Sequence, residues 1–239
     1  MEERSRPILR GQGETDYERY LRTDELLALQ KTAGEVVHRD EHLFQAVHQS
    51  SELWLKLACT ELEQATVLLS GDEVLPAVRL LRRANDCIAL ITTQLHMLEH
   101  LSPVDYAVVR TALGHGAGFD SPGFRGVHRV SPALGAAFES LLARRGAPLI
   151  AVYRGEVEHE DLYQLAEQMV TWDERVILWR FHHLKIVERI IGGNVIGTQG
   201  TPVEVLGKRI DVRFFPALWT VRDEITGSSP LGAGGHSNS

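Results

Sequence analysis

Cysteine is scarce in this chain of 239 residues, which contains only Cys59 and Cys87. Both lie among apolar neighbours in segments with a helical pattern. Two cysteines exclude a disulfide framework, and they exclude the closed zinc sites that need three or four thiolates. Because this scarcity is typical of proteins from reducing compartments, we expect a cytoplasmic location.

Long apolar runs and an excess of basic residues are also absent. No stretch approaches about 18 uninterrupted apolar residues, so we expect no transmembrane helix and no membrane partner. The opening segment, MEERSRPILR, lacks the apolar core of a secretory signal. Lysine and arginine number 25 against 32 acidic residues, which gives a formal net charge of −7. This acidic balance argues against nucleic acid as the main partner.

What the sequence does contain is strong helical periodicity. Apolar residues make up 44% of the chain, and they recur at steps of three and four through several long segments. We expect helices over residues 40–70, 73–100, 102–114, 131–144, 160–191 and 214–225. Residues 114–126 and 192–212 are expected to be irregular, and the small, polar tail 227–239 is expected to be disordered. The sequence therefore predicts an all-α fold, a single-domain helical bundle over residues 1–226.

Histidine is frequent, with eleven residues, and one of them stands out. At 100° per residue, Trp179, Val187 and Ile190 lie within about 40° of His183 on the predicted helix. His183 therefore belongs to an apolar stripe, where an imidazole suits an axial ligand of haem iron. A core histidine bonded to a backbone carbonyl is the alternative.

A second histidine lies on the stripe of the first long helix. His48 follows Phe44 by four residues, so the two side chains share one helix face. The imidazole would orient a substrate N–H group or act as a base, and the phenyl ring would pack on an aromatic substrate. Here too, a core histidine with its hydrogen bonds satisfied is the alternative.

Tyr106 and Arg110 form another pair four residues apart, bordered by apolar residues. An arginine on such a face is costly to bury without a partner, and a bidentate carboxylate would satisfy it. That carboxylate belongs either to a substrate or to an acidic residue of the protein, and a solvated arginine is the third possibility.

Other polar segments carry weaker signals. The loops 114–119 and 197–201 offer backbone N–H groups and hydroxyls to a ligand, but both serve equally well as plain connections. The pairs His96 with His100 and His38 with His42 have a spacing that permits metal binding. Neither pair has a third ligand, and the chain has no HExxH motif, so we expect solvated faces.

Taken in order, five blocks resemble the tryptophan 2,3-dioxygenase family. The longest is Phe44-x-x-x-His48-Gln49-Ser50-Ser51-Glu52-Leu53-Trp54, which is similar to the FxxxHQTSELW signature of that family. The other blocks are Tyr17-Glu18-Arg19-Tyr20-Leu21, Tyr106-x-x-x-Arg110 with Leu113-Gly114 and Gly118-Phe119, His183-x-x-x-Val187-x-Arg189-x-Ile191-Gly192, and Phe214-Phe215-Pro216-Ala217-Leu218-Trp219. The similarity extends over roughly residues 17 to 222, nearly the whole expected bundle.

The resemblance implies an all-α homotetramer that binds one haem b per subunit and uses O₂ as co-substrate. The family inserts both oxygen atoms across the indole C2–C3 bond of L-tryptophan and produces N-formylkynurenine, in the kynurenine pathway. By resemblance, His183 is the proximal iron ligand and His48 is the catalytic residue on the distal side, near the indole N–H. The resemblance also implies that Phe44 and Tyr106 form walls around the substrate, that Arg110 binds the substrate carboxylate, and that Thr198 contacts the substrate's ammonium or carboxylate group. It implies that Tyr17 and Tyr20 reach the pocket of a neighbouring subunit. Finally, it implies that Ser51, Ala117 and Gly118 contact the haem.

Three departures from the family pattern motivate alternatives. Only 63 residues separate Phe119 from His183, which is shorter than in the family, so a peripheral helical piece is missing. Ala117 replaces a serine, and the loop 197–202 reads GTQGTP where the family has GTGGSSG. One alternative is a haem-dependent monooxygenase or dioxygenase that acts on a substituted tryptophan in specialised metabolism. Another is a non-catalytic haem sensor, against which the complete amino-acid clamp argues.

Overall fold

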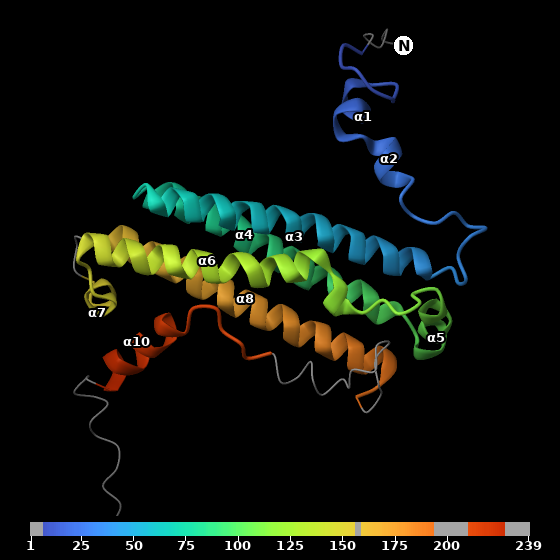
Figure 1. Cartoon of the computed structure of the whole chain (residues 1–239). Helices are drawn as coiled ribbons and strands as arrows, with labels where there is room; N and C mark the ends of the chain where they lie inside the picture. The colour runs from blue at the N-terminus through green and yellow to red at the C-terminus, as the bar shows by residue number, and fades with distance from the viewer. Residues whose placement is uncertain (1–6, 156–158, 194–209, 228–239) are drawn as a thin grey trace, which may run out of the picture.

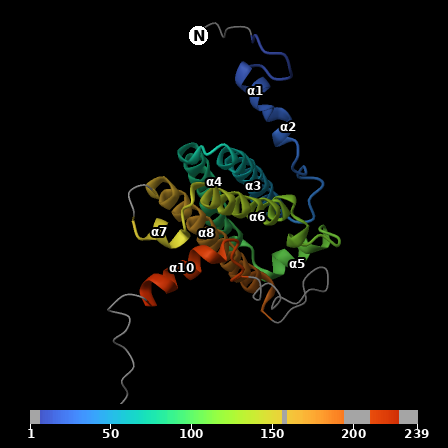
Figure 2. The same ribbon diagram turned by 60° about the vertical axis from the view of Figure 1, so that its left-hand side comes forward.

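Four long helices lie side by side in the computed structural model, which describes residues 7–155, 159–193 and 210–227 (Figures 1 and 2). They are α3 (Glu41–Ser70), α4 (Val74–Gln94), α6 (Pro122–Arg145) and α8 (Glu160–Ile191). All regular elements in the described part are helical, which confirms the all-α prediction. In those residues, no helix is both long and apolar enough to cross a membrane. Most of the predicted tail, residues 228–239, lies outside the described part.

Shorter helices connect and cover this bundle. The 3₁₀ helix η1 (Leu95–His100) continues α4, and α5 (Pro103–Thr111) starts at the predicted Ser102 cap, whose hydroxyl accepts from Asp105 N. The 3₁₀ turn η2 (Gly118–Asp120) leads into α6, while α7 (Leu149–Tyr153) and α10 (Pro216–Gly227) cover one end. At the N-terminus, α1 (Asp16–Leu21) and α2 (Thr23–Leu27) contain no buried residue, and this arm extends away from the bundle (Figures 1 and 2).

The core of the bundle is aliphatic and is centred on one tryptophan. Trp172 is fully buried, and its indole Nε1 donates to Ser131 Oγ at 2.9 Å, which satisfies the only polar atom of the side chain. Cys59 and Cys87 are buried and free, as predicted. Burial raises the pKa of the Cys59 thiol to about 11, so this thiol is chemically inert at neutral pH.

One element begins earlier than the sequence predicts. We expected a loop over residues 114–126 and a helix from residue 131, but α6 starts at Pro122. The glycines that suggested a loop instead allow α6 to approach α3. A Cβ atom on Gly123 would lie 2.6 Å from Leu55 Cβ, and one on Gly126 would lie 2.9 Å from Cys59 Sγ. The helix tolerates these glycines because tight packing outweighs their low helix propensity.

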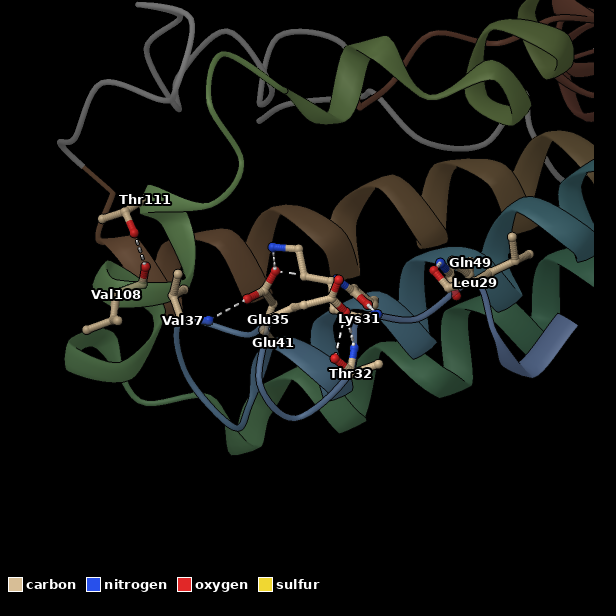
Figure 3. A network of polar contacts seen from close by, with 10 residues as sticks. Leu29, Lys31, Thr32, Glu35, Val37, Glu41, Gln49, Val108 and Thr111 are labelled. Atoms are coloured by element: carbon tan, nitrogen blue, oxygen red, sulfur yellow. Dashed lines mark hydrogen bonds and ion pairs between the residues drawn. The ribbon is translucent and has the colours of Figure 1, made fainter. Parts of the chain in front are cut away.

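The segment between α2 and α3, residues 28–40, is fastened to one face of α3 (Figure 3). Glu41 is 3% exposed and accepts from Lys31 Nζ and from Val37 N. Further along the same face, Gln45 Oε1 accepts from Lys31 N at 3.0 Å, and Gln49 Nε2 donates to Leu29 O at 3.4 Å. The hydrogen bond from Lys31 holds the pKa of the Glu41 carboxyl below its ordinary value. These contacts fix where the N-terminal arm leaves the bundle.

A buried carboxylate anchors the C-terminal segment on α8. Asp173 is 1% exposed and accepts from Phe214 N at 2.7 Å, Phe215 N at 3.0 Å and Trp219 Nε1 at 3.1 Å. Burial raises the pKa of this carboxyl, and the three donors oppose that rise. The predicted closing helix is thereby held in place, as α10.

Replacing Asp173 with alanine is expected to destabilise the protein by about 3–5 kcal/mol, because it leaves buried donors without an acceptor. Urea unfolding followed by circular dichroism measures this change. Asp86→Ala is the control, since Asp86 is an exposed partner in an ion pair on α4, and such a change stays within about 0.5 kcal/mol. Equal unfolding midpoints for the two variants would contradict the anchoring role.

Candidate functional site

A cavity of about 460 Å³ opens between α3, α5, the loop before α6, and α8. Most of its lining residues are apolar. Within the described part of the chain, no three His, Cys, Asp or Glu side chains are grouped so as to hold a metal ion. The pairs His96 with His100 and His38 with His42 therefore belong to no such group of three. Eight of the predicted site residues line the cavity, namely Phe44, His48, Ser51, Tyr106, Arg110, Ala117, Gly118 and His183.

His48 projects into the cavity from α3 with a defined tautomer. Its Nδ1 lies 2.7 Å from the carbonyl oxygen of Phe44. Because a carbonyl only accepts, Nδ1 carries the proton, and Nε2 of the neutral ring is an acceptor. Burial lowers the pKa of His48, although the Phe44 bond and the negative charge of Glu52 oppose this effect. The ring also stacks on Phe44 with centroids 4.0 Å apart. One nitrogen thus has the backbone bond of a core histidine while the ring lines the cavity.

His183 lines the cavity from α8. Trp179, Val187 and Ile190 line it with His183, as the helical spacing predicts. Burial lowers the pKa of His183 to about 4, so the imidazole is neutral at physiological pH, which is the form that binds metals. In the described residues the ring has no hydrogen-bond partner, so the alternative of a carbonyl-bonded core histidine is not observed there.

The α5 helix brings an aromatic ring and a guanidinium group to the cavity. Tyr106 and Arg110 both line it, one helical turn apart, and the rings of Tyr106 and Phe44 have centroids 6.0 Å apart. Burial raises the pKa of the Tyr106 phenol, and the charge of Arg110 opposes this rise. Val109, between them, is fully buried and holds α5 against the protein. This wall combines an aromatic surface with a positive charge.

The remaining predicted cavity residues are on α3 and in the loop before α6. The hydroxyl of Ser51 donates to Val47 O at 2.8 Å and accepts from Gln94 Nε2 at 2.5 Å, so its only donor is already engaged. Ala117 and Gly118 lie close to the α8 wall, since a Cβ atom on Gly118 would be 3.8 Å from His183 Cε1. The loop therefore reaches the candidate iron ligand.

The other predicted residues are not part of this cavity. Tyr17 and Tyr20 are 69% and 78% exposed on α1, and the arm that carries them points away from the bundle (Figure 2). Thr198 and the loop 197–202 lie outside the described residues. The pocket of a single chain thus contains neither tyrosine.

Sequence reasoning missed five polar or aromatic lining residues, Glu52, Ser121, Phe124, His128 and Arg180. Arg180 precedes His183 by one helical turn, and that spacing is the signal that could have found it. Its Nη1 donates to Val212 O at 2.9 Å and its Nη2 donates to His128 Nε2 at 3.2 Å. Its buried Nε has no hydrogen-bond partner among the described residues. Burial lowers the pKa of this guanidinium. The cavity therefore has a second positive charge that is not fully satisfied.

The sequence model of tryptophan 2,3-dioxygenase matches residues 3–136 and 127–225, nearly the whole described chain. The chain belongs to the tryptophan 2,3-dioxygenase family. Among curated relatives, the tryptophan 2,3-dioxygenase of Myxococcus xanthus is 32% identical over 91% of this chain and 92% of its own length. The tryptophan 2,3-dioxygenases of Saccharopolyspora erythraea and Kineococcus radiotolerans are each 33% identical over 89% of this chain. These matches cover 93% and 92% of the two relatives' own lengths.

This member of the tryptophan 2,3-dioxygenase family is shortened, as predicted. The alignment with the M. xanthus enzyme runs over 269 positions, more than the 239 residues of this chain, so the relative contains segments that this chain lacks. The two matched segments of the family model overlap at residues 127–136, inside α6. This overlap lies in the interval between Phe119 and His183, in which the sequence is shorter than in the family.

Proposed function

We propose that this protein is a haem-dependent oxygenase that adds O₂ across the indole C2–C3 bond of L-tryptophan and releases N-formylkynurenine. The observation that carries the proposal is the shared cavity of His48, His183 and Arg110, which come from three helices. This set supplies a candidate iron ligand, a hydrogen-bond acceptor and a partner for a carboxylate. Membership in the tryptophan 2,3-dioxygenase family supports the same reaction.

The residues of the cavity fit a haem. His183 offers one neutral nitrogen, which suits an iron that brings its own four porphyrin ligands. The charged residues in the described lining are Arg110, Arg180 and Glu52, which gives this lining a net positive charge. In the part of the chain that the structure describes, the buried Nε of Arg180 has no hydrogen-bond partner, and a haem propionate is an anion of the kind that would offset this charge. When bound, the haem supplies the site at which O₂ is held and activated.

The opposite walls fit the substrate. Phe44 and Tyr106 provide aromatic surfaces for an indole ring, and Arg110 is placed to pair with the amino-acid carboxylate. Nε2 of His48 is the acceptor for the indole N–H, because Nδ1 is committed to the Phe44 carbonyl. These residues bind and orient the substrate. Thr198 is proposed to contact its ammonium or carboxylate group.

The proposal also includes the extent of the domain, the cellular location and the oligomeric state. We infer that residues 1–226 act as one haem-binding domain and that the protein is a cytoplasmic homotetramer. The exposed Tyr17 and Tyr20 support this arrangement, because an arm without buried residues gains stability by packing on a neighbouring subunit.

Product mass after incubation of the reduced, haem-loaded protein with L-tryptophan and ¹⁸O₂ tests the function. Two labelled atoms in N-formylkynurenine are the expected result. One labelled atom would contradict it and would favour the monooxygenase alternative. If L-tryptophan gives no product although the haem spectrum is intact, the same assay is repeated with substituted tryptophans. A product from one of them would favour an oxygenase of substituted tryptophans, and no product would favour a haem sensor.

His48→Ala is expected to lower kcat/KM roughly tenfold or more and to leave haem content unchanged, because one hydrogen bond to the substrate is lost. Since the acceptor role needs the neutral ring and burial lowers its pKa, wild-type kcat/KM should decline only below the ordinary histidine value of 6.5. The variant should lack this acidic decline. A pH series of both proteins checks the prediction, and an identical decline in the variant would contradict it.

A further inference from the structure

Among the described residues that line the cavity, Glu52 is the only carboxylate, and the proposed reaction gives it no task. It lies on α3, one helical turn after His48. Its Oε1 accepts from the hydroxyl of Ser121, and its Oε2 accepts from Gly123 N at 2.8 Å. Both donors belong to the start of α6. Glu52 therefore connects the helix of the candidate catalytic histidine to a second wall of the cavity.

The contact is an interhelical cap. The first N–H groups of an α-helix have no partner within the helix, and that end carries partial positive charge. Ser121 caps α6 locally by accepting from Phe124 N at 3.0 Å, and the Glu52 carboxylate satisfies Gly123 N from outside. The two backbones must be close for this geometry, since a Cβ atom on Gly123 would lie 2.8 Å from Glu52 Oε2.

The cap also holds the loop that precedes it. Asp120 Oδ2 accepts from Ala117 N at 2.9 Å, and Asp120 N donates to Ala117 O at 2.9 Å. Ser121 N donates to Gly118 O at 3.3 Å. The turn is therefore tied together internally, and a displacement at Ser121 is transmitted to Gly118, the residue that faces His183.

We propose that Glu52 is a positioning residue that fixes the loop 114–121 against α3 and thereby sets the separation of the loop from His183. It does so with two acceptor oxygens, both engaged by α6. A glutamine at this position keeps one acceptor oxygen for Gly123 N but loses the negative charge that faces the helix terminus. Its amide nitrogen can meet Ser121 only by donating to the hydroxyl oxygen, so the hydroxyl proton loses its acceptor. The effect on the loop does not depend on the reaction, and only its consequence for the haem rests on the proposed function.

The test compares Glu52→Gln with Glu63→Gln. Glu63 is a matched control because it also lies on α3 and contacts α6, through an exposed ion pair with Arg129. Hydrogen exchange read by mass spectrometry is expected to show amides of residues 117–125 exchanging roughly tenfold faster or more in the first variant, with the rest of the bundle unchanged. The control should match the wild type.

A second readout reports on the cavity itself. The C–O stretching frequency of the carbon monoxide complex is sensitive to groups near the iron, so it is expected to shift in Glu52→Gln and not in Glu63→Gln. Ser121→Ala, a milder change, should give a smaller shift, and the double variant should show less than the sum of the two.

Unchanged exchange over residues 117–125, or an equal increase in every helix, would overturn the positioning role. If the exchange response is observed but the wild type forms no oxygenated product, the proposed function fails and the role of Glu52 in holding the loop stands. The two results are therefore distinguishable.

Discussion

His183→Ala protein is expected to lose stable haem. Mutation of the groups that hydrogen-bond to a metal ligand already lowers metal affinity about 10–100-fold, so removal of the ligand itself should lower it by more. Turnover of tryptophan should fall below detection, and the pyridine haemochrome assay measures the haem content.

The neighbouring histidine provides the control. His182 is adjacent in sequence but does not line the cavity, and its ring lies 6.3 Å from that of His96. His182→Ala should retain haem at the wild-type level. Added imidazole should restore haem binding to His183→Ala, because the deleted side chain leaves room for the free base. Normal haem content in His183→Ala would refute the ligand assignment.

Arg110→Ala is expected to raise the dissociation constant for L-tryptophan by roughly 10- to 150-fold, the equivalent of a charge-assisted hydrogen bond of about 1.5–3 kcal/mol. Tryptamine, which lacks the carboxylate, should bind the variant and the wild type equally well. Optical titration of the haem spectrum measures both constants.

Arg175→Ala is the matched control, since Arg175 lies on α8 in an ion pair with Asp86 and does not line the cavity. It should bind both ligands as the wild type does. An equal loss of affinity for tryptophan and tryptamine in Arg110→Ala would show that the residue shapes the cavity and does not pair with a carboxylate.

The long helices were predictable because their apolar periodicity is continuous. The expected helices over residues 40–70 and 160–191 are α3, Glu41–Ser70, and α8, Glu160–Ile191. The start of α6 was not predictable, because its glycines satisfy a packing requirement imposed by α3, which lies more than 50 residues earlier in the chain. The short helices α1, α2 and α7 were not expected, since five or six residues give too little periodicity to detect.

The residues of the candidate site also divide into those that the sequence predicts and those that it does not. His48, Tyr106, Arg110 and His183 were found because each lies on an apolar stripe or in a motif, although their roles stay predictions. Glu52 and Arg180 were missed as lining residues, since charged side chains next to an apolar stripe usually face solvent. Only the packing of helices distant in sequence determines that these two are turned toward a cavity.

His48 and His183 line the cavity from α3 and α8, so the site is assembled from segments that lie far apart in the chain. During synthesis, the N-terminal helices leave the ribosome well before α8 is made. A nascent chain that has folded α3 and α4 has an acceptor histidine but no iron ligand. Under the proposed ligand assignment, haem enters an almost finished polypeptide, and a chain that terminates within α6 is expected not to retain it.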